Sequence, residues 1–431
     1  MKHAFLFWMK RTVIALGIIV LAVLCTAVAS AAMLFASLRA TPGEWAQAVP
    51  VGPWHVQLSV PAVLRLATHP LGLRALAGRS FHTSHGTLRF QQGADESSIR
   101  MVCDPCTPHA AVLGKGALRL QRTELSLTRV GQNHLHGDVL AGAVRATWKV
   151  QIEKRSVDLR VQVPDAPIAD FYAAVGANIP ELERATIEGR AGAELSVALP
   201  SGVWRVLPRI EGFSVSGLGT EALLGATPQP ACARPTRRAD ATAPFGAWLP
   251  RAVVAAEDQR FYEHAGIDVV EMRAAWRSGT DTNPHPRGAS TLSQQLAKLL
   301  YTGDERSAVR KLREALYAVE MDRVLGKARV LQLYLTVAPW GNGQCGAQAA
   351  SLQVLHKRAS AVTPIEAAWL ASLLRNPEAE LARVAANGSV DKARVAEIIE
   401  AMRPLARTRR EALQQQLGDW APPATSAFAA R

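Results

Sequence analysis

The stretch Glu257-Asp258-Gln259-Arg260-Phe261-Tyr262-Glu263-His264-Ala265-Gly266-Ile267-Asp268 is the feature on which our interpretation of the chain depends. Glu257 directly follows a small apolar segment, residues 252–256. A carboxylate beside an apolar segment tends to have a raised pKa and is suited to act as a general base. We expect Asp258 and His264 to orient it, and Phe261 and His264, three residues apart, to share a helix face. An isolated Glu-Asp pair is more often a solvated acidic turn, so this stretch alone does not decide a function.

A second polar cluster, Gly288-Ala289-Ser290-Thr291-Leu292-Ser293-Gln294-Gln295, follows closely. Its segment Thr291-Leu292-Ser293-Gln294 fits a capping box and predicts a helix that starts near Ser290. The hydroxyl groups and free backbone N–H groups at such a helix start favour a bound phosphate. Gln294 and Lys298 are four residues apart and would share a face of this helix.

A third cluster, Arg310-Lys311-Leu312-Arg313-Glu314, places two cations and a carboxylate on one face of a further helix. With Lys298 and Arg306, these cations are suited to hold a diphosphate. A carboxylate among them would instead suit a divalent metal ion that bridges phosphates. Alone, the cluster would more often be a solvated helix face. Together with Glu257, it describes an activated diphosphate donor and a base for its acceptor.

The residues after 247 are predicted to be entirely α-helical, because apolar residues recur at helical spacing and β-branched runs are rare. Thr363-Pro364-Ile365-Glu366 marks a second helix start, with Thr at the cap and Glu three residues later. We expect the chain after Pro422 to be a disordered tail.

The clusters above closely resemble, in order, the motifs of the peptidoglycan glycosyltransferases of family 51, the transglycosylase domain of penicillin-binding proteins. The resemblance covers residues 235–405 and implies an all-α, lysozyme-like fold. The matching motifs are Glu257-Asp258-x-x-Phe261-x-x-His264-x-Gly266-x-Asp268, Gly288-x-Ser290-Thr291-x-x-Gln294-Gln295-x-x-Lys298, Arg310-Lys311-x-x-Glu314, Lys327-x-x-Val330-Leu331-x-x-Tyr334-Leu335 and Thr363-Pro364-Ile365-Glu366-Ala367-Ala368-Trp369-Leu370-Ala371, with Asn376-Pro377 after the last.

This resemblance implies an enzyme that polymerises lipid II into glycan strands and releases undecaprenyl diphosphate. Glu257 would deprotonate the 4-hydroxyl of the acceptor sugar, whose oxygen attacks the anomeric carbon of the growing chain with inversion. Glu314 would stabilise the leaving diphosphate, directly or as the ligand of a divalent cation, Mg²⁺ or Mn²⁺. The resemblance implies substrate-binding roles for Asp258, Phe261, His264, Ser290, Thr291, Gln294, Gln295, Lys298, Arg306, Arg310 and Lys311.

Some positions depart from the family pattern. Gln332 and Thr336 stand where the fourth motif usually has Glu and Asn, and the segment 269–287 is polar where relatives dip into the membrane. The motifs of a transpeptidase do not follow the domain, so we expect glycan synthesis without cross-linking. The first alternative is a catalytically weak or inactive exported scaffold that binds lipid-linked glycan precursors. The second is a lysozyme-like hydrolase, which would have no use for the cationic cluster.

The N-terminus predicts attachment to a membrane. An apolar run from Thr12 to Leu38 follows Lys2, Lys10 and Arg11, and a span of about 20 apolar residues crosses a bilayer. The basic flank predicts a cytoplasmic N-terminus and a periplasmic catalytic region. A cleaved signal peptide, with 27–29 as its cleavage site, is the alternative. The net charge of +13 favours anionic partners such as membrane lipids, whereas the 6% content of aromatic residues argues against a nucleic-acid platform.

Residues 40–225 show the alternating pattern of half-buried antiparallel strands, for example in 86–90, 116–120 and 157–163. Helical insertions are expected at 61–77 and at 167–185. Strand pairs followed by a short helix resemble the exported domains of the AsmA type, in a spacer or docking role. Transpeptidases or other wall-synthesis proteins are further expected partners. The predicted division is 1–11 cytoplasmic tail, 12–38 anchor, 40–225 β-rich periplasmic domain, 226–247 proline-rich linker, 248–405 glycosyltransferase domain and 406–431 C-terminal tail.

The cysteines fit an oxidising compartment. Cys103-Asp104-Pro105-Cys106 is open to interpretation as a redox centre, half a zinc site or a structural disulfide. A zinc site lacks a second pair, and redox activity lacks a thioredoxin-like context, so we favour the disulfide. Cys232 and Cys345 are the remaining exported cysteines, and we predict a disulfide that pins the linker to the last domain.

Overall fold

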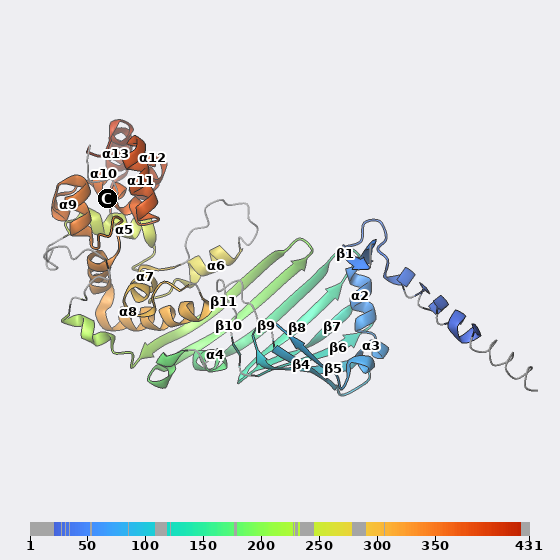
Figure 1. The fold of residues 1–431 in the computed structure, drawn as a ribbon. Coiled ribbons are helices and arrows are strands. Elements are labelled where there is room, and N and C mark those ends of the chain that lie inside the picture. The colour runs from blue at the N-terminus through green and yellow to red at the C-terminus, as the bar shows by residue number, and fades with distance from the viewer. Residues whose placement is uncertain are drawn as a thin grey trace, which may run out of the picture.

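A computed structural model describes residues 21–423 of the 431-residue chain, with gaps. It consists of a β-rich region and a helical C-terminal region, preceded by an apolar helix (Figure 1). The predicted cytoplasmic tail, the segment 116–118 of one expected strand, most of the linker and the end of the C-terminal tail lie outside the described residues. The gaps within the described range are 27, 31, 34, 52–53, 85, 108–118, 121, 176–178, 227, 229–231, 233–244, 278–289 and 306.

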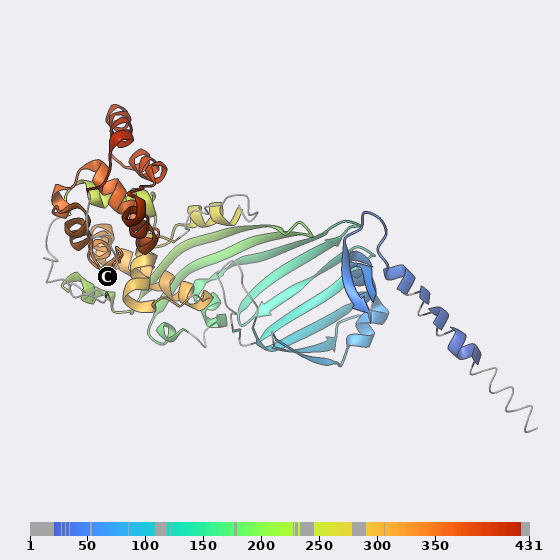
Figure 2. The ribbon, with the colours of Figure 1, turned by 45° about the horizontal axis from the view of Figure 1, so that its top comes forward.

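The apolar helix Leu21–Leu38 has a mean hydropathy of 2.2, and none of its described residues is buried. It projects away from the folded regions (Figure 2). Its 18 residues rise about 27 Å, close to the thickness of the hydrocarbon core of a bilayer. The helix is compatible with single-pass anchoring, and a signal sequence would have the same length and apolar composition.

The β-rich region is built on an antiparallel meander in which each strand pairs with its neighbours in sequence, in the order β11-β10-β9-β8-β7-β6-β5-β4-β3. A separate hairpin pairs β1 (Ala46–Val51) with β2 (Trp54–Ser59). The strands of the large sheet are β3 (Ser80–Thr83), β4 (Gly86–Gln92), β5 (Ser98–Cys106), β6 (Thr123–Val130), β7 (His134–Ala141), β8 (Val144–Ile152), β9 (Val157–Pro167), β10 (Thr186–Leu199) and β11 (Val203–Ser216).

The alternation in sequence gives this sheet one apolar face. Trp148 stands opposite Val161, which in turn stands opposite Leu195 on the next strand. Side chains two residues apart point to the same face of a strand, so a single register gathers the apolar residues of all the central strands. Helices α2 (Val60–Ala67) and α3 (Pro70–Leu76) confirm the insertion predicted at 61–77, and Leu64 of α2 packs against the apolar cluster around Trp148.

The second insertion lies between β9 and β10. It forms α4 (Ile168–Val175) and the short 3₁₀ helix η3 (Pro180–Glu183), as predicted for 167–185. A further 3₁₀ helix, η4 (Thr220–Leu224), follows β11 and ends the β-rich region. These segments all lie at the end of the sheet that faces the C-terminal helices (Figure 1).

Among its described residues, the C-terminal region consists of helices joined by turns and loops, in agreement with the predicted all-α class. Helix α10 (Pro364–Leu373) is its centre, because every residue of this helix is buried. The other elements are α5 (Trp248–Glu257), α6 (Val269–Arg277), α7 (Leu292–Ala297), the π-helical turn η5 (Lys298–Thr302), α8 (Ala308–Val337), α9 (Ala347–Leu355), η6 (Ala359–Ala361), α11 (Pro377–Asn387), α12 (Lys392–Ala401) and α13 (Arg407–Asp419).

Both predicted helix starts are confirmed. Thr291 caps α7 and Thr363 caps α10, each in a complete capping box with the residue three positions later. The prediction of a C-terminal tail from residue 406 is wrong for α13. Its Leu413 and Leu417 are buried against the core, and the Trp420 ring lies 5.5 Å from that of Trp369. The polar composition of α13 concealed the few apolar residues that dock it.

Both predicted disulfides are present. Cys103 pairs with Cys106 at the end of β5, which supports the structural interpretation of this Cys-x-x-Cys sequence. Cys232 pairs with Cys345 across 113 residues and ties the linker to the loop before α9.

Candidate active site

Glu257 is the last residue of α5 and is half-buried. Burial raises its pKa above the ordinary value, and the negative charge of Asp258 adds to the rise. A hydrogen bond from Gln295 and the positive charge of Arg394 oppose it. Glu257 therefore has the property expected of a general base: a carboxylate whose proton affinity is raised by an apolar setting.

The hydrogen bond to Glu257 comes from the second cluster, across a gap of 38 residues in sequence. Gln295 Nε2 donates to Glu257 Oε2 at 3.0 Å. The Tyr334 hydroxyl donates to Gln295 Oε1 at 2.8 Å, so the amide must direct its NH₂ group toward the carboxylate. Burial and the nearby Glu257 raise the pKa of Tyr334, which keeps this hydroxyl protonated. The family resemblance implies a substrate-binding role for Gln295, and in the structure its amide contacts the carboxylate of Glu257.

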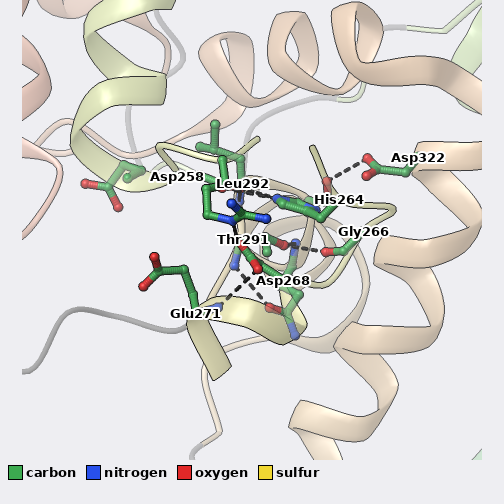
Figure 3. A network of polar contacts seen from close by, with 12 residues as sticks. Asp258, His264, Gly266, Asp268, Glu271, Thr291, Leu292 and Asp322 are labelled. Atoms are coloured by element: carbon green, nitrogen blue, oxygen red, sulfur yellow. Dashed lines mark hydrogen bonds and ion pairs between the residues drawn. The ribbon is translucent and has the colours of Figure 1, made fainter. Parts of the chain in front are cut away.

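Asp258, next to the base, is buried and fixes the start of α7. Leu292 N–H donates to Asp258 Oδ2 at 2.9 Å, and His264 Nε2 lies 3.1 Å from both carboxylate oxygens (Figure 3). Because Lys327 Nζ lies 3.4 Å from His264 Nδ1 and carries only donors, Nδ1 must accept and Nε2 must donate. Asp258 thus joins the loop after Glu257 to the helix that carries Gln295.

An ion pair between Lys327 and Asp322 of α8 lies against the loop that follows Glu257. Lys327 Nζ lies 2.5 Å from Asp322 Oδ2 and 4.4 Å from the centre of the Phe261 ring. Ser293 donates to the other oxygen of Asp322 at 2.7 Å. We predicted Phe261 and His264 on one helix face, and this prediction is wrong, since residues 258–268 form turns and isolated bridges. The two rings still meet, edge to face, at 6.3 Å.

Gly266 and Asp268 close the loop against α7 and α8. Gly266 has φ of 85°, and a Cβ there would lie 2.6 Å from the backbone nitrogen of Val319 in α8, so only glycine fits. Its carbonyl accepts a hydrogen bond from the Thr291 hydroxyl at 2.5 Å. Asp268 accepts from Arg260 and from the first N–H groups of α6. These contacts explain why the motif needs a glycine and an aspartate at this spacing.

The cationic cluster assembles as predicted on α8. Glu314 is completely buried and forms ion pairs with Arg310 and with Lys311, whose Nζ lies 2.8 Å from Glu314 Oε2. Lys311 Nζ also donates to the Ser290 hydroxyl at 2.7 Å. Burial lowers the pKa of Lys311 to about 8, and the neighbouring cations Arg310 and Lys298 add to this effect. The cluster thus holds concentrated positive charge that an anionic ligand would stabilise.

Lys298 lies where α7 changes into the π-helical turn η5. Its ammonium group pairs with Asp304 at 2.6 Å. A π-helical turn is often found at a functional site because it displaces a side chain from the regular helical position. Arg306, the other predicted cation, lies outside the described residues.

The predicted phosphate site at the start of α7 is not supported. Thr291 N–H donates to Gln294 Oε1, and Gln294 N–H donates to Thr291 Oγ1. Leu292 N–H is taken by Asp258. The side chains of Thr291 and Gln294 therefore cap the helix, and these amides are not free for a phosphate. The sequence pattern predicted the capping box correctly. The same amide and hydroxyl groups cannot cap the helix and bind a phosphate at the same time.

Glu314, the residue predicted to bind a divalent ion, does not fit one in this arrangement. Glu314 lies between two cations, so a metal ion there would have to displace Arg310 or Lys311. Among the described residues, Asp258, His264 and Asp268 form a group whose ligand atoms lie within 4.8 Å of one another and could hold a metal ion. Each of them already has hydrogen-bond donors or ion-pair partners. We therefore derive no chemical step through a metal ion.

Arg394 is a site residue that the sequence did not reveal. It lies on α12, and its Nη2 donates to the carbonyl oxygen of Ala256 at 2.8 Å, directly before the base. No local pattern relates position 394 to position 256, which are 138 residues apart. Gln332 and Thr336, which depart from the family pattern, bond within α8. Gln332 Oε1 accepts from Arg329, and the Thr336 hydroxyl donates to the Gln332 carbonyl.

Comparison with known proteins agrees with this geometry. Residues 231–403 match the family model described as Transglycosylase. The chain is 41% identical over 129 residues to a biosynthetic peptidoglycan transglycosylase of Nitrosomonas eutropha. The aligned segment is 30% of this chain and 53% of that protein. The chain is 47% identical over 130 residues to the one of Klebsiella oxytoca (30% and 54%) and 44% identical over 136 residues to the one of Rhodopseudomonas palustris (31% and 60%).

The chain thus spans only 53 to 60% of the length of these curated relatives. The matched range begins in the linker and includes Glu257, the cationic cluster and α12, whereas the large sheet lies outside it. Over residues 231–403, the chain is therefore similar in sequence to the transglycosylase family and to these biosynthetic peptidoglycan transglycosylases.

Proposed function

We propose that this chain is a membrane-bound peptidoglycan glycosyltransferase that joins lipid II units into glycan strands and releases undecaprenyl diphosphate. The observation that carries the proposal is the position of α7 between two chemically opposite groups. Near its end, Gln295 holds the base Glu257, and just before its start Ser290 holds the cation Lys311. One short helix thus connects a proton acceptor with a site for a leaving diphosphate.

On the acceptor side, Glu257 would take the proton of a sugar hydroxyl. The Gln295 amide keeps one carboxylate oxygen occupied, so the other oxygen is available for the substrate. The hydroxyl oxygen then attacks the anomeric carbon of the donor, and the bond from that carbon to the diphosphate oxygen breaks. The proton ends on Glu257, the electron pair leaves with the diphosphate, and the single displacement inverts the anomeric carbon.

On the donor side, Lys298, Arg310 and Lys311 would neutralise the charge that develops on the diphosphate. Fixed cations in a partly buried site stabilise such charge most effectively, because they need no reorganisation during the reaction. Glu314 keeps Arg310 and Lys311 in place through its two ion pairs. Its proposed role is therefore to hold the cations, and this role does not require a metal ion between Glu314 and the phosphates.

The location follows from the same proposal. Undecaprenyl-linked substrates lie in a membrane, and the helix Leu21–Leu38 would keep the chain at that membrane. A disulfide between Cys232 and Cys345 suits an oxidising compartment, so we place the catalytic domain on the periplasmic side. The proposed lysozyme-like arrangement of the helices rests on the family resemblance.

The test is a polymerisation assay with labelled lipid II and the full chain in detergent or liposomes. The variant Glu257→Gln keeps the shape of the side chain but removes the base. We expect a loss of about 10²- to 10⁴-fold in rate, the usual contribution of a positioned base. Glu263→Gln is the matched control, because Glu263 lies in the same loop but is exposed and pairs only with Arg260 among the contacts described.

Glycan polymer from the wild type and from Glu263→Gln, but not from Glu257→Gln, would support the proposal. Equal amounts of polymer from wild type and Glu257→Gln would exclude Glu257 as the base. A wild type that binds lipid II without any turnover would exclude the transferase and favour a precursor-binding scaffold.

A further inference from the structure

The β-rich region and the catalytic helix α8 share one hydrophobic core. Buried residues of the β-rich region, among them Ile168, Tyr172 and Leu218, belong to the same cluster as Leu316 and Val319 of α8. Val175 at the end of α4 packs with Ala308 at the start of α8. The contact therefore covers the N-terminal turns of α8, where the cationic cluster lies.

A buried ion pair reaches the cluster itself. Glu181 of η3 is 3% exposed, and both of its oxygens accept from Arg313 Nε at 2.9 Å, with Arg313 Nη2 at 2.7 Å. Burial works against ionisation of Glu181, but the bonds to Arg313 more than offset it and hold its pKa below the ordinary value. Arg313 precedes Glu314 directly, so this ion pair fixes the turn of α8 from which Glu314, Arg310 and Lys311 project.

Two further contacts come from the same insertion between β9 and β10. One lies beside Lys311, and the other leads to the turn that carries Lys298. The Tyr172 hydroxyl donates to the carbonyl oxygen of Leu312 at 3.0 Å, next to Lys311. Arg184 Nη2 donates to the Tyr317 hydroxyl at 3.2 Å. The Tyr317 ring stacks in parallel on Tyr301 at 4.1 Å, and Tyr301 belongs to η5, the π-helical turn that begins with Lys298.

The remainder of α8 is attached to the β-rich region as well. Glu320 is 1% exposed and accepts the backbone N–H groups of Leu218 at 2.8 Å and Thr220 at 3.2 Å. Arg323 Nε donates to the Val215 carbonyl oxygen at 3.1 Å. These bonds join side chains of α8 to the end of β11 and to the backbone that follows it, so α8 cannot shift without breaking them.

We propose that the β-rich region is a working part of the transferase, and that Glu181 and Arg184 are positioning residues for the diphosphate-binding cations. Glu181 acts through Arg313 on the turn that carries Arg310 and Lys311. Arg184 acts through Tyr317 and Tyr301 on the turn that carries Lys298. The inference rests on the proposed function for its effect on turnover, but its effect on diphosphate binding is independent of that function.

Positioning matters here because the cations repel one another. Lys311 is buried beside Arg310 and Lys298, and its lowered pKa of about 8 reflects the cost of that arrangement. Long cationic side chains separate when their backbone is free to move, which would remove the concentrated charge that binds a diphosphate. Fixing both turns from outside keeps the cations together before the substrate arrives.

The experiment uses the full chain and four variants: Glu181→Gln, Arg313→Gln, the double variant, and Glu194→Gln as the matched control. Glu194 lies on β10 of the same region and forms an exposed ion pair with Arg209 of β11, at 3.1 Å, within the large sheet. The measurements are KM and kcat for lipid II, the dissociation constant of inorganic diphosphate, and the thermal unfolding midpoint. Assays are run well below that midpoint, so that every variant is folded.

We expect Glu181→Gln to raise both KM and the dissociation constant of inorganic diphosphate about 3- to 10-fold, the effect of losing one ordinary hydrogen bond, because Glu181 acts on the cations only through Arg313. The effect on kcat should be smaller, since the donor diphosphate is anionic before its bond breaks. The double variant should match Arg313→Gln, because the two residues act through one contact. Glu194→Gln should leave both constants unchanged.

Unchanged KM and diphosphate affinity in Glu181→Gln, with only a lower unfolding midpoint, would show a merely structural contact and overturn the inference. Additive effects in the double variant would also overturn it. A wild type without turnover would refute the proposed function, while weaker diphosphate binding by Glu181→Gln would still support the positioning role.

Discussion

The hydrogen bond from Gln295 to Glu257 gives a quantitative prediction about pH. Removing the amide, as in Gln295→Met, leaves the carboxylate without the donor at 3.0 Å that stabilises its ionised form. Such a bond to a charged group contributes about 1.5–3 kcal/mol, and one pKa unit corresponds to about 1.4 kcal/mol. The pKa of Glu257, already raised by burial, should therefore rise by about one to two further units.

The sign follows from the role of Glu257 as a base. Only the ionised carboxylate accepts a proton, so activity is present above its pKa and is lost as pH falls through that value. In Gln295→Met, the acidic limb of the profile of kcat/KM against pH should move to higher pH by about one to two units. Tyr334→Phe removes only the hydroxyl that orients the Gln295 amide. The acidic limb of the pH profile of this variant should therefore move less, by up to about one unit.

The assay is lipid II polymerisation across a pH series at constant ionic strength, because kcat/KM reports the pKa values of the free enzyme. Gln332→Met is the matched control, since it makes the same chemical change at an exposed position of α8. At high pH, Gln295→Met should recover most of the wild-type rate. An acidic limb that stays in place in Gln295→Met would refute the assignment of Glu257 as the titrating base, or of Gln295 as its partner.

Three further predictions concern charge, the disulfide and the interface. Lys311 has a pKa of about 8, below its ordinary value of 10.5, so kcat/KM should fall as pH rises through about 8; Lys311→Arg, which stays charged, should move this limb up by at least two units. Replacement of both Cys232 and Cys345 by Ser opens a link between residues 113 positions apart and should lower the free energy of unfolding by about 2–4 kcal/mol in a denaturant titration; an unchanged midpoint and slope would contradict this. Glu320→Leu leaves two buried N–H groups without their acceptor and should cost about 3–5 kcal/mol in the same titration, whereas Glu221→Leu, at an exposed position of η4, should have little effect.

Local patterns predicted the helix starts, the strands and the insertions because the forces that decide them act within a few residues. Thr291 and Thr363 each reach an amide three positions away, so the sequence alone contains both members of the capping box. Glu314, Arg310 and Lys311 are likewise one helical turn apart and meet as expected. The same locality explains the wrong prediction of a shared helix face for Phe261 and His264, since partners from α7 and α8 hold this loop in turns.

Contacts between distant segments could not be predicted in this way. The contact of Gln295 with Glu257 was not predicted, because their distance depends on how α5 and α7 pack. Arg394 reaches the residue before Glu257 from another helix, and Glu181 reaches Arg313 from another region. The amide of Leu292, expected to be free at the start of α7, is bonded to Asp258, which lies 34 residues earlier. Each of these contacts depends on how distant segments pack together. A single sequence has no periodicity or spacing pattern that indicates such contacts.

The central claim is that the chain transfers a sugar from a diphosphate donor to a sugar hydroxyl, with Glu257 as the base. The most direct test counts two products in one reaction with labelled lipid II: released undecaprenyl diphosphate and new reducing ends of the glycan. Transfer joins each released sugar to an acceptor, so we predict diphosphate release with almost no new reducing ends, and neither product from Glu257→Gln. One new reducing end for every diphosphate released would show hydrolysis by water and would contradict the account.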